Sequence, residues 1–388
     1  MAFILVEILI SIAALYEIKS ERPQRKVFSA IFILLSFMIC FRYGQGSDYY
    51  AYEQNYKDVT ATGSLLVNTL RHGEIGWYVL LVIGKRLGLS WTLFVAIVSA
   101  FMMISIGRII FREAKYGCFS LLLFFPVYYL VYLYSAVRQG IALTIFLGYA
   151  LSALLKKRYL KYYLLIVAAV LFHSSAIILF LLPVFLWTEK LKERKYFLIF
   201  VPVVFALGAS GYLNSAIAFF GAAYYLKTEF SILGTLIRII TFSIIYFIHR
   251  TYCKTKDRTV ESVLFDLYTL GFCIAMMLSF SDLISQRLTV YLKAIEILLV
   301  PLQFYSIQSK IKESQTLLAK RQGVTNNIIL LTLLFVAIMN VQLIHNIRSF
   351  IIQGNYYSWV DVVNYPYINI FDKDAILKYR PYNLLFVS

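Results

Sequence analysis

The chain has 388 residues, of which 61% are hydrophobic and only 15% are charged. Soluble globular domains average about 45–50% apolar and about 25% charged residues, so this composition excludes an ordinary soluble protein. A formal charge of +17 would favour nucleic acid in a soluble protein, but here the basic residues cluster in short connectors between apolar runs. Cytoplasmic loops collect Lys and Arg, so membrane topology explains most of the excess and no nucleic-acid partner is expected.

Apolar runs follow one another along almost the whole chain. Since a spanning helix needs roughly 20 mostly apolar residues, we expect an all-α, polytopic transmembrane bundle of about ten to twelve membrane segments. We find no internal repeat and expect a single domain, residues 1–388. The first run lacks a basic leader and a cleavage site, which predicts a retained helix rather than a signal peptide. The runs are residues 2–18, 27–41, 77–89, 91–111, 118–134, 140–155, 163–187, 196–207, 233–248, 263–280, 288–306 and 328–344.

The basic connectors restrict the topology. If all of them face the cytoplasm, one crossing too many lies between Lys26 and Arg108, and another between Lys161 and Lys190. Either some basic loops lie outside, or two apolar runs do not cross. We favour broken or re-entrant helices at 77–89, which is short, and at 163–187, which is interrupted by polar residues. The connectors are residues 19–26, 108–115, 156–161, 190–195, 249–258 and 310–321.

This topology predicts which segments face outward. The N-terminus and the turn at Arg138 lie on the outer side, together with loops at about 42–73, 208–232 and 281–287 and a tail at about 345–388. The stretch 214–230 is intermediate in character and fits an interfacial helix. The two largest polar loops are therefore expected outside.

The first outer segment combines glycines, tyrosines and charges. Arg42 ends an apolar run, Gly44 and Gly46 permit tight turns, and Asp48 follows among tyrosines that include Tyr52. One interpretation is an aromatic belt at the membrane interface with a helix-stop charge. The other is a carboxylate beside aromatic platforms for sugars, with Asp48 as a general base or acid. Glu53 and Glu74 are further acidic candidates.

Two arginines lie at the outward ends of apolar runs. Arg138, followed by Gln139, separates two long runs with almost no loop, and Arg287 lies in a short turn that precedes Tyr291. Charges at membrane depth are costly and usually functional, and a guanidinium binds phosphate oxygens in bidentate fashion. The alternatives are a snorkelling Arg138 and a surface ion pair between Arg287 and Asp282.

His173 lies in the middle of an apolar run, followed by Ser174 and Ser175. It is either a satisfied structural histidine or a proton-transfer group, because its pKa in water is near neutral. In both cases it should face the protein interior. The tyrosines and Trp359 of the tail fit interface anchoring or carbohydrate stacking equally well. The cysteines at 40, 118, 253 and 273 have no metal-ligand spacing and are expected to be packing residues.

No nucleotide-binding, zinc or nucleophile-elbow motif occurs in the sequence, and we expect no cofactor and no metal. An outward site also has no access to nucleotide. The energy for a group transfer there would come from the substrate itself, for example from a lipid diphosphate leaving group.

Taken together, these residues resemble the EpsG family of Wzy-type polysaccharide polymerases. The resemblance covers about residues 40–370, with Ser47 where relatives often have Thr and Gly140 at a position that varies. The matching pieces are 42–49 with Tyr52, 74–77, 137–142, 172–176, Arg287 with Tyr291, and 365–367.

The resemblance implies a glycosyltransferase of the bacterial cytoplasmic membrane. It would join oligosaccharide units carried on undecaprenyl diphosphate into O-antigen or exopolysaccharide on the outer face, with a chain-length regulator as a candidate partner. Arg138 and Arg287 would hold the diphosphate, and Asp48 or His173 would deprotonate the acceptor hydroxyl. Arg42 would orient Asp48 or a second phosphate.

The remaining residues of the expected substrate site are Gln139, Tyr52 and Tyr291. Two other functions fit a chain of this composition. One is a flippase for the same lipid-linked sugar, although transporters usually have paired inverted halves and none is detectable here. The other is a membrane sugar O-acyltransferase.

Overall fold

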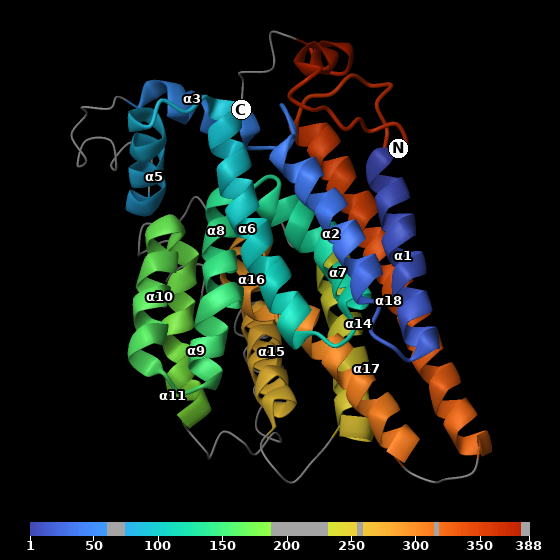
Figure 1. Ribbon diagram of the computed structural model, residues 1–388. Helices are drawn as coiled ribbons and strands as arrows, with labels where there is room; N and C mark the ends of the chain where they lie inside the picture. The colour runs from blue at the N-terminus through green and yellow to red at the C-terminus, as the bar shows by residue number, and fades with distance from the viewer. Residues whose placement is uncertain (60–73, 188–231, 254–258, 314–317, 382–388) are drawn as a thin grey trace.

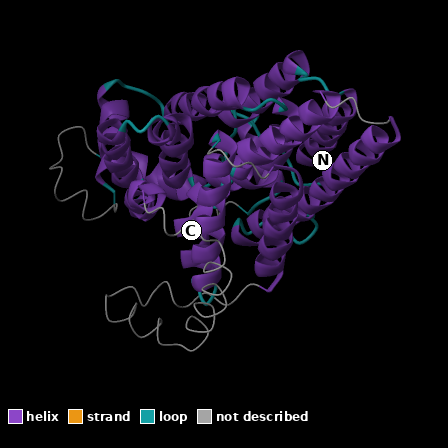
Figure 2. Ribbon diagram, turned by 90° about the horizontal axis from the view of Figure 1, so that it is seen from below, coloured by secondary structure: helices purple, strands orange, loops and turns teal. Residues whose placement is uncertain are grey.

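The computed structural model describes residues 1–59, 74–187, 232–253, 259–313 and 318–381. Within these ranges the chain is helical, and an isolated bridge is the only extended pairing (Figure 2). This confirms the expected all-α class. The α-helices are α1 (Ala2–Ser20), α2 (Arg25–Cys40), α3 (Tyr49–Asp58), α5 (Ile75–Arg86), α6 (Trp91–Glu113), α7 (Gly117–Phe124), α8 (Val137–Ile145), α9 (Leu151–Leu155), α10 (Tyr159–Phe172), α11 (Leu182–Trp187), α14 (Ile232–Ile248), α15 (Val260–Met277), α16 (Asp282–Lys293), α17 (Glu296–Glu313) and α18 (Leu318–Gln353).

Several of these helices continue into wider or tighter turns. Residues of η1, η2 and η6 are π-helical, and those of η3 and η7 form 3-10 helices. The bounds are η1 (Phe125–Leu133), η2 (Phe146–Ala150), η3 (Ser174–Leu181), η6 (His249–Cys253) and η7 (Lys373–Lys378).

Five described helices are long and apolar enough to cross a membrane, or six if α16 and α17, bent by 42°, form one span. The protein is therefore a multi-pass membrane protein, but the number of full-length spans in the described residues is below the ten to twelve segments expected. Some apolar runs form shorter helices, and α1 contains two glutamates and a lysine. The expected run 196–207, the interfacial stretch 214–230 and most of the loop 208–232 lie outside the described residues. The five spans are Trp91–Glu113, Val137–Leu155, Ile232–Cys253, Val260–Met277 and Asn326–Gln353.

The helix expected at 163–187 is broken, as the polar residues predicted. α10 ends at Phe172, His173 is extended with φ −155° and ψ 118°, and η3 begins at Ser174. η3 and α11 then return alongside α10 toward the lower end of the bundle in Figure 1. With 14 residues α10 rises only about 21 Å, which is short of a hydrocarbon core of about 30 Å.

The segment expected at 77–89 is also short. α5 has 12 residues and rises about 18 Å, and its first turn packs against the end of α10. The contact is close, because a Cβ at Gly76 would lie 2.8 Å from the carbonyl oxygen of Leu171. The start of α5 is thereby held beside the break at His173.

The basic ends of three helices point away from the upper end of the bundle. In Figure 1 α1 and α6 run downward and end above the lowest ends of α17 and α18, with Lys19 and Arg112 in their last turns, and α2 begins at its lower end at Arg25. The N-terminus and the C-terminal segment lie at the upper end. The basic ends of α1, α2 and α6 therefore lie opposite the upper end, which carries the segment that follows α2 and the tail.

The tail covers the upper end of the bundle. α18 continues to Gln353, so the non-helical tail begins later than the expected 345. The backbone N–H of Tyr43 donates to Ile368 O at 2.9 Å, and that of Ile370 donates to Phe41 O at 2.9 Å. These bonds attach the tail to the segment that follows α2.

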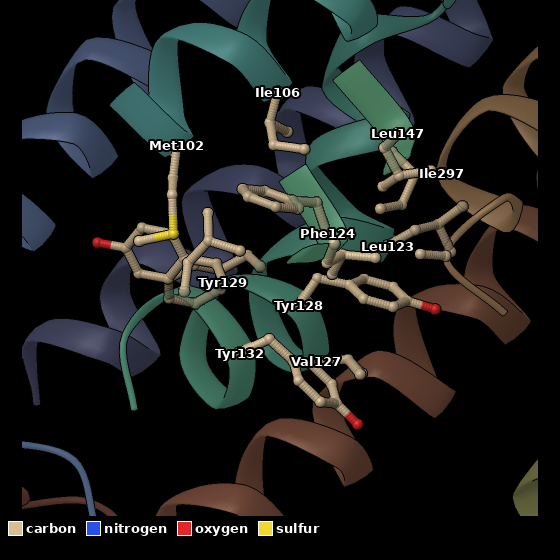
Figure 3. Close-up of a cluster of buried hydrophobic side chains, with 14 of the residues drawn as sticks. Met102, Ile106, Leu123, Phe124, Val127, Tyr128, Tyr129, Tyr132, Leu147 and Ile297 are labelled. Atoms are coloured by element: carbon tan, nitrogen blue, oxygen red, sulfur yellow. The ribbon is translucent and has the colours of Figure 1, made fainter. Parts of the chain in front are cut away.

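The tyrosines of η1 connect the core to neighbouring helices (Figure 3). The Tyr129 hydroxyl donates to Leu35 O at 2.8 Å, and the Tyr128 hydroxyl donates to Glu296 Oε1 at 2.7 Å. Polar groups buried in a lipid-embedded bundle must find such partners, because no water is available there. η1 is thus fixed to α2 and α17 by hydrogen bonds as well as by packing.

Gly140 allows α8 to pack closely against η1. A Cβ at this position would collide with the carbonyl of Tyr132 and lie 3.2 Å from Leu133 Cα, and backbone atoms cannot rotate away as a side chain can. Small residues at helix contacts of membrane proteins permit this kind of approach.

We expect Gly140→Ala to lower the stability of the protein by about 1–3 kcal/mol through overpacking. Thermal unfolding in detergent measures the effect. Gly323→Ala is the matched control, since a Cβ there would meet nothing within 4 Å. Equal melting temperatures for Gly140→Ala and Gly323→Ala would contradict the close contact.

Candidate functional site

The turn between η1 and α8 positions the first part of the site. η1 ends at Leu133, and α8 begins at Val137, which places Arg138 and Gln139 in its first turn. The segment between α2 and α3 contacts this turn, where the Ser47 N–H donates to Ser135 Oγ at 2.9 Å.

Gly46 makes this passage possible. It has a φ of +95°, and its Cβ position lies 3.1 Å from the carbonyl oxygen of Tyr134. The positive φ and the limited space both favour glycine.

Glu74 joins Arg138 to His173. One carboxylate oxygen pairs with Arg138 Nη1, and the other lies 3.1 Å from His173 Nδ1. The Glu74 and His173 side chains are each 13% exposed, and that of Arg138 is 32% exposed. The first turns of α5 and α8 and the break after α10 therefore meet in one ionic cluster, which we call the Arg138–Glu74–His173 triad.

Asp48 and Tyr52 extend the triad toward α3. The Tyr52 hydroxyl donates to Asp48 Oδ2 at 3.4 Å and accepts from Arg138 Nε at 3.4 Å. The Arg138 guanidinium also lies 5.5 Å from the centre of the Tyr52 ring. The Ser47 hydroxyl donates to Asp48 Oδ1 at 2.9 Å.

A second hydrogen-bond chain starts from Gln139. Its amide Nε2 donates to the backbone carbonyl of Arg287 at 2.8 Å and to Ser175 Oγ at 3.3 Å. Ser175 Oγ lies 3.0 Å from the Tyr291 hydroxyl. α8, η3 and α16 are connected in this way, so seven of the eight residues singled out from the sequence belong to two adjacent chains of contacts.

Arg42 occupies a different place. It is only 2% exposed, and its Nη1 donates to Ile39 O at 2.7 Å and to Ser99 Oγ at 2.8 Å. Its guanidinium lies 4.9 Å from the centre of the Tyr134 ring. These contacts connect α2 to α6 and to the turn before α8. Orientation of Asp48 or of a phosphate by Arg42 stays a prediction.

The surroundings of Glu74 favour its ionised form. Burial opposes ionisation, but the hydrogen bond from His173 and the charge of Arg138 outweigh it, so the pKa of Glu74 lies below its usual value. Burial and the neighbouring Asp48 raise the pKa of Tyr52, whose hydroxyl therefore stays protonated. The site thus holds a carboxylate, a guanidinium, an imidazole and a neutral phenol in contact.

The sequence identifies Glu74 only as a further acidic candidate and does not place Ser175 in the site. The signal for Glu74 was its position directly before an apolar run too short to cross the bilayer. No group of three or more His, Cys, Asp or Glu side chains in the described ranges could hold a metal ion.

These features define a polytopic α-helical membrane protein with a charged, half-buried site at the upper part of its bundle. The model of the EpsG family matches residues 25–348, and the chain belongs to this family of Wzy-type polysaccharide polymerases. Its general role is therefore in polysaccharide polymerisation. No match was found among curated proteins or among solved structures.

The ion pair of the triad can be tested by a double-mutant cycle on stability. We expect Glu74→Gln and Arg138→Met to be coupled by about 1–3 kcal/mol, because each single change removes the opposite charge that the other residue contacts. Thermal unfolding of the two single variants and the double variant gives the coupling energy.

The control cycle uses Arg112 and Glu113, an exposed pair whose side chains are 45% and 49% exposed. Its coupling energy should not exceed about 0.5 kcal/mol. Additive effects of Glu74→Gln and Arg138→Met would show that the triad makes no stabilising ion pair.

Proposed function

We propose that this chain joins oligosaccharide repeat units carried on undecaprenyl diphosphate, on the outer face of the bacterial cytoplasmic membrane. The observation that carries the proposal is the Arg138–Glu74–His173 triad, in which a phosphate-binding side chain and a proton acceptor share one carboxylate. Membership of the EpsG family supports the reaction class.

The distribution of charge supports the outer face. Basic residues collect in cytoplasmic loops, and the basic ends of α1, α2 and α6 lie opposite the end that carries α3 and the tail (Figure 1). Arg138 of the triad contacts Tyr52 of α3, so the triad lies in the upper part of the bundle. Nucleotide is absent there, so the diphosphate of the donor supplies the energy of transfer.

His173 is the base that the geometry favours. When Nδ1 donates to the Glu74 carboxylate, the ring is held in the tautomer whose Nε2 accepts a proton. The carboxylate also stabilises the imidazolium that forms on proton transfer, as in other base–carboxylate pairs. Asp48 is the second candidate, but its oxygens already accept hydrogen bonds from Ser47 and Tyr52.

Arg138 and Arg287 act on the leaving group. A guanidinium placed where negative charge develops lowers the barrier, and bidentate contact to phosphate oxygens also fixes the orientation. Gln139 holds the backbone of Arg287 at 2.8 Å and so sets the distance between the first turn of α8 and α16. Tyr52 and Tyr291 position Arg138 and Ser175.

The transfer step follows from these roles. The acceptor hydroxyl oxygen at the non-reducing end of one unit bonds to the anomeric carbon of the donor glycan, while the bond from that carbon to the diphosphate oxygen breaks. The bonding electrons leave with undecaprenyl diphosphate, and the hydroxyl proton passes to His173. The growing glycan is then attached to the newer lipid carrier.

We expect Arg138→Ala to abolish long polymer and to leave single lipid-linked units in the membrane. The measurement is gel analysis of surface polysaccharide from a deletion strain that carries the variant, with immunoblotting for membrane insertion. Arg112→Ala, a change at an exposed arginine, is the matched control and should restore polymer fully. Polymer of normal length from Arg138→Ala would overturn the proposed role.

The choice of base has its own test. Removal of a general base typically costs about 10²–10⁴-fold in rate, so we expect His173→Gln to lose at least about 100-fold in polymerisation by purified protein. Asp48→Asn should lose less than about tenfold, because its amide oxygen keeps one of the two hydrogen bonds from Ser47 and Tyr52 and the proposed base, His173, is unchanged. The opposite ranking of the two variants would make Asp48 the base.

A further inference from the structure

A polar cavity of about 330 Å³ lies between α14, α16, α18 and η1. Arg238 lines it from α14, Lys293 and Asp282 from α16, and His345 from α18. Ser47 and Ser135, which hydrogen-bond to each other beside the triad, form part of the same wall. Arg138, Glu74 and His173 do not line the cavity, so it is a separate space that begins next to the triad.

Two cations face this cavity. Arg238 is held on one side by Nη1, which donates to Ser285 Oγ at 2.8 Å and lies 3.4 Å from Thr289 Oγ1. Lys293 Nζ lies 5.8 Å from the centre of the Tyr128 ring. Both side chains belong to apolar stretches, where a charge is costly and usually serves a function.

The nearby carboxylates accept hydrogen bonds from neutral groups. Glu296 is fully buried and accepts from the hydroxyls of Tyr128 at 2.7 Å and Tyr268 at 3.2 Å. Asp282 Oδ2 accepts from Gln286 Nε2 at 2.6 Å. In the described ranges, neither Arg238 nor Lys293 forms an ion pair of the kind that joins Arg138 to Glu74.

An anion of the size of a diphosphate fits these features. Two cations on the wall of a cavity within an apolar bundle are expensive unless a negative ligand shares the space. The serines and the amide groups of Gln342 and Asn346 add neutral polar groups for its oxygens. α14 also exposes Leu233, Leu236 and Ile240, so an apolar tail can lie along the helix whose arginine meets the headgroup.

We propose that the cavity between Arg238 and Lys293 binds the diphosphate group of the acceptor, the lipid-linked unit that receives the growing glycan. The assignment to the acceptor rests on the proposed polymerase function. The donor diphosphate departs at the reacting carbon and belongs beside Arg138. The acceptor diphosphate lies one repeat unit away from its reacting hydroxyl and needs a second cationic site near the triad.

The test measures binding of farnesyl diphosphate, a short isoprenoid diphosphate, to the full-length protein in lipid nanodiscs. We expect Arg238→Met with Lys293→Met to weaken binding by at least about tenfold, since hydrogen bonds to charged groups are lost. Arg238→Lys with Lys293→Arg keeps both charges and should stay within about threefold of the unchanged protein. Arg112→Met controls for general loss of positive charge.

Two probes separate the sources of the anion. Inorganic pyrophosphate should bind more weakly than farnesyl diphosphate, and nanodiscs rich in phosphatidylglycerol should not displace the isoprenoid. Equal affinity for inorganic pyrophosphate would overturn the lipid assignment, as would displacement by phosphatidylglycerol.

The binding assay tests the cavity proposal, and polymer formation, as measured for Arg138→Ala, tests the polymerase function. Unchanged farnesyl diphosphate affinity in the Arg238→Met, Lys293→Met variant would overturn the cavity proposal even if polymerisation is observed. Binding that depends on Arg238 and Lys293 in a protein that makes no polymer would support the anion site and contradict the polymerase function. Melting temperatures of the methionine and the charge-conserving variants show whether a loss of binding is a loss of folding.

Discussion

The partly buried carboxylate of Glu74 is the constraint on which the upper part of this bundle depends. An ionised carboxylate is costly in a lipid-embedded bundle unless cations and hydrogen-bond donors surround it. Arg138 and His173 provide these groups, and they come from segments far apart in the chain. The first turn of α5, the first turn of α8 and the end of α10 are therefore held together by charge rather than by apolar packing alone.

The broken helices allow the chain to bring these three charged or polar side chains together inside the bundle. A continuous helix across the membrane satisfies its own backbone, whereas a helix end leaves N–H and C=O groups that need polar surroundings. α10 stops at Phe172 and η3 starts at Ser174, so an imidazole and two serines replace a turn of apolar helix. The interruption breaks the helix and places polar side chains inside the bundle.

The sequence predicted much of this site because charges in apolar runs are rare. Arg138 and His173 stood out for that reason, and Asp48 because it lies among tyrosines and glycines; the structure places the three within one set of contacts. The central place of Glu74 depends on how α5 packs against α10, which spacing along the chain does not reveal. Arg42 is predicted from the resemblance to orient Asp48 or a second phosphate, but its partners Ile39 and Ser99 become visible only when α2 and α6 are packed.

Paired and unpaired cations have different uses in such a bundle. Arg138 is held by a carboxylate and a phenol, so its position is fixed before any substrate arrives, as stabilisation of a developing charge requires. Among the described residues, Arg238 lies against the hydroxyls of Ser285 and Thr289, which orient the guanidinium without neutralising it. A cation with no carboxylate partner attracts an anionic headgroup, whereas Arg138 keeps its charge but is oriented by its ion pair with Glu74. This difference between adjacent sites suits the proposed reaction, in which one diphosphate leaves and another stays.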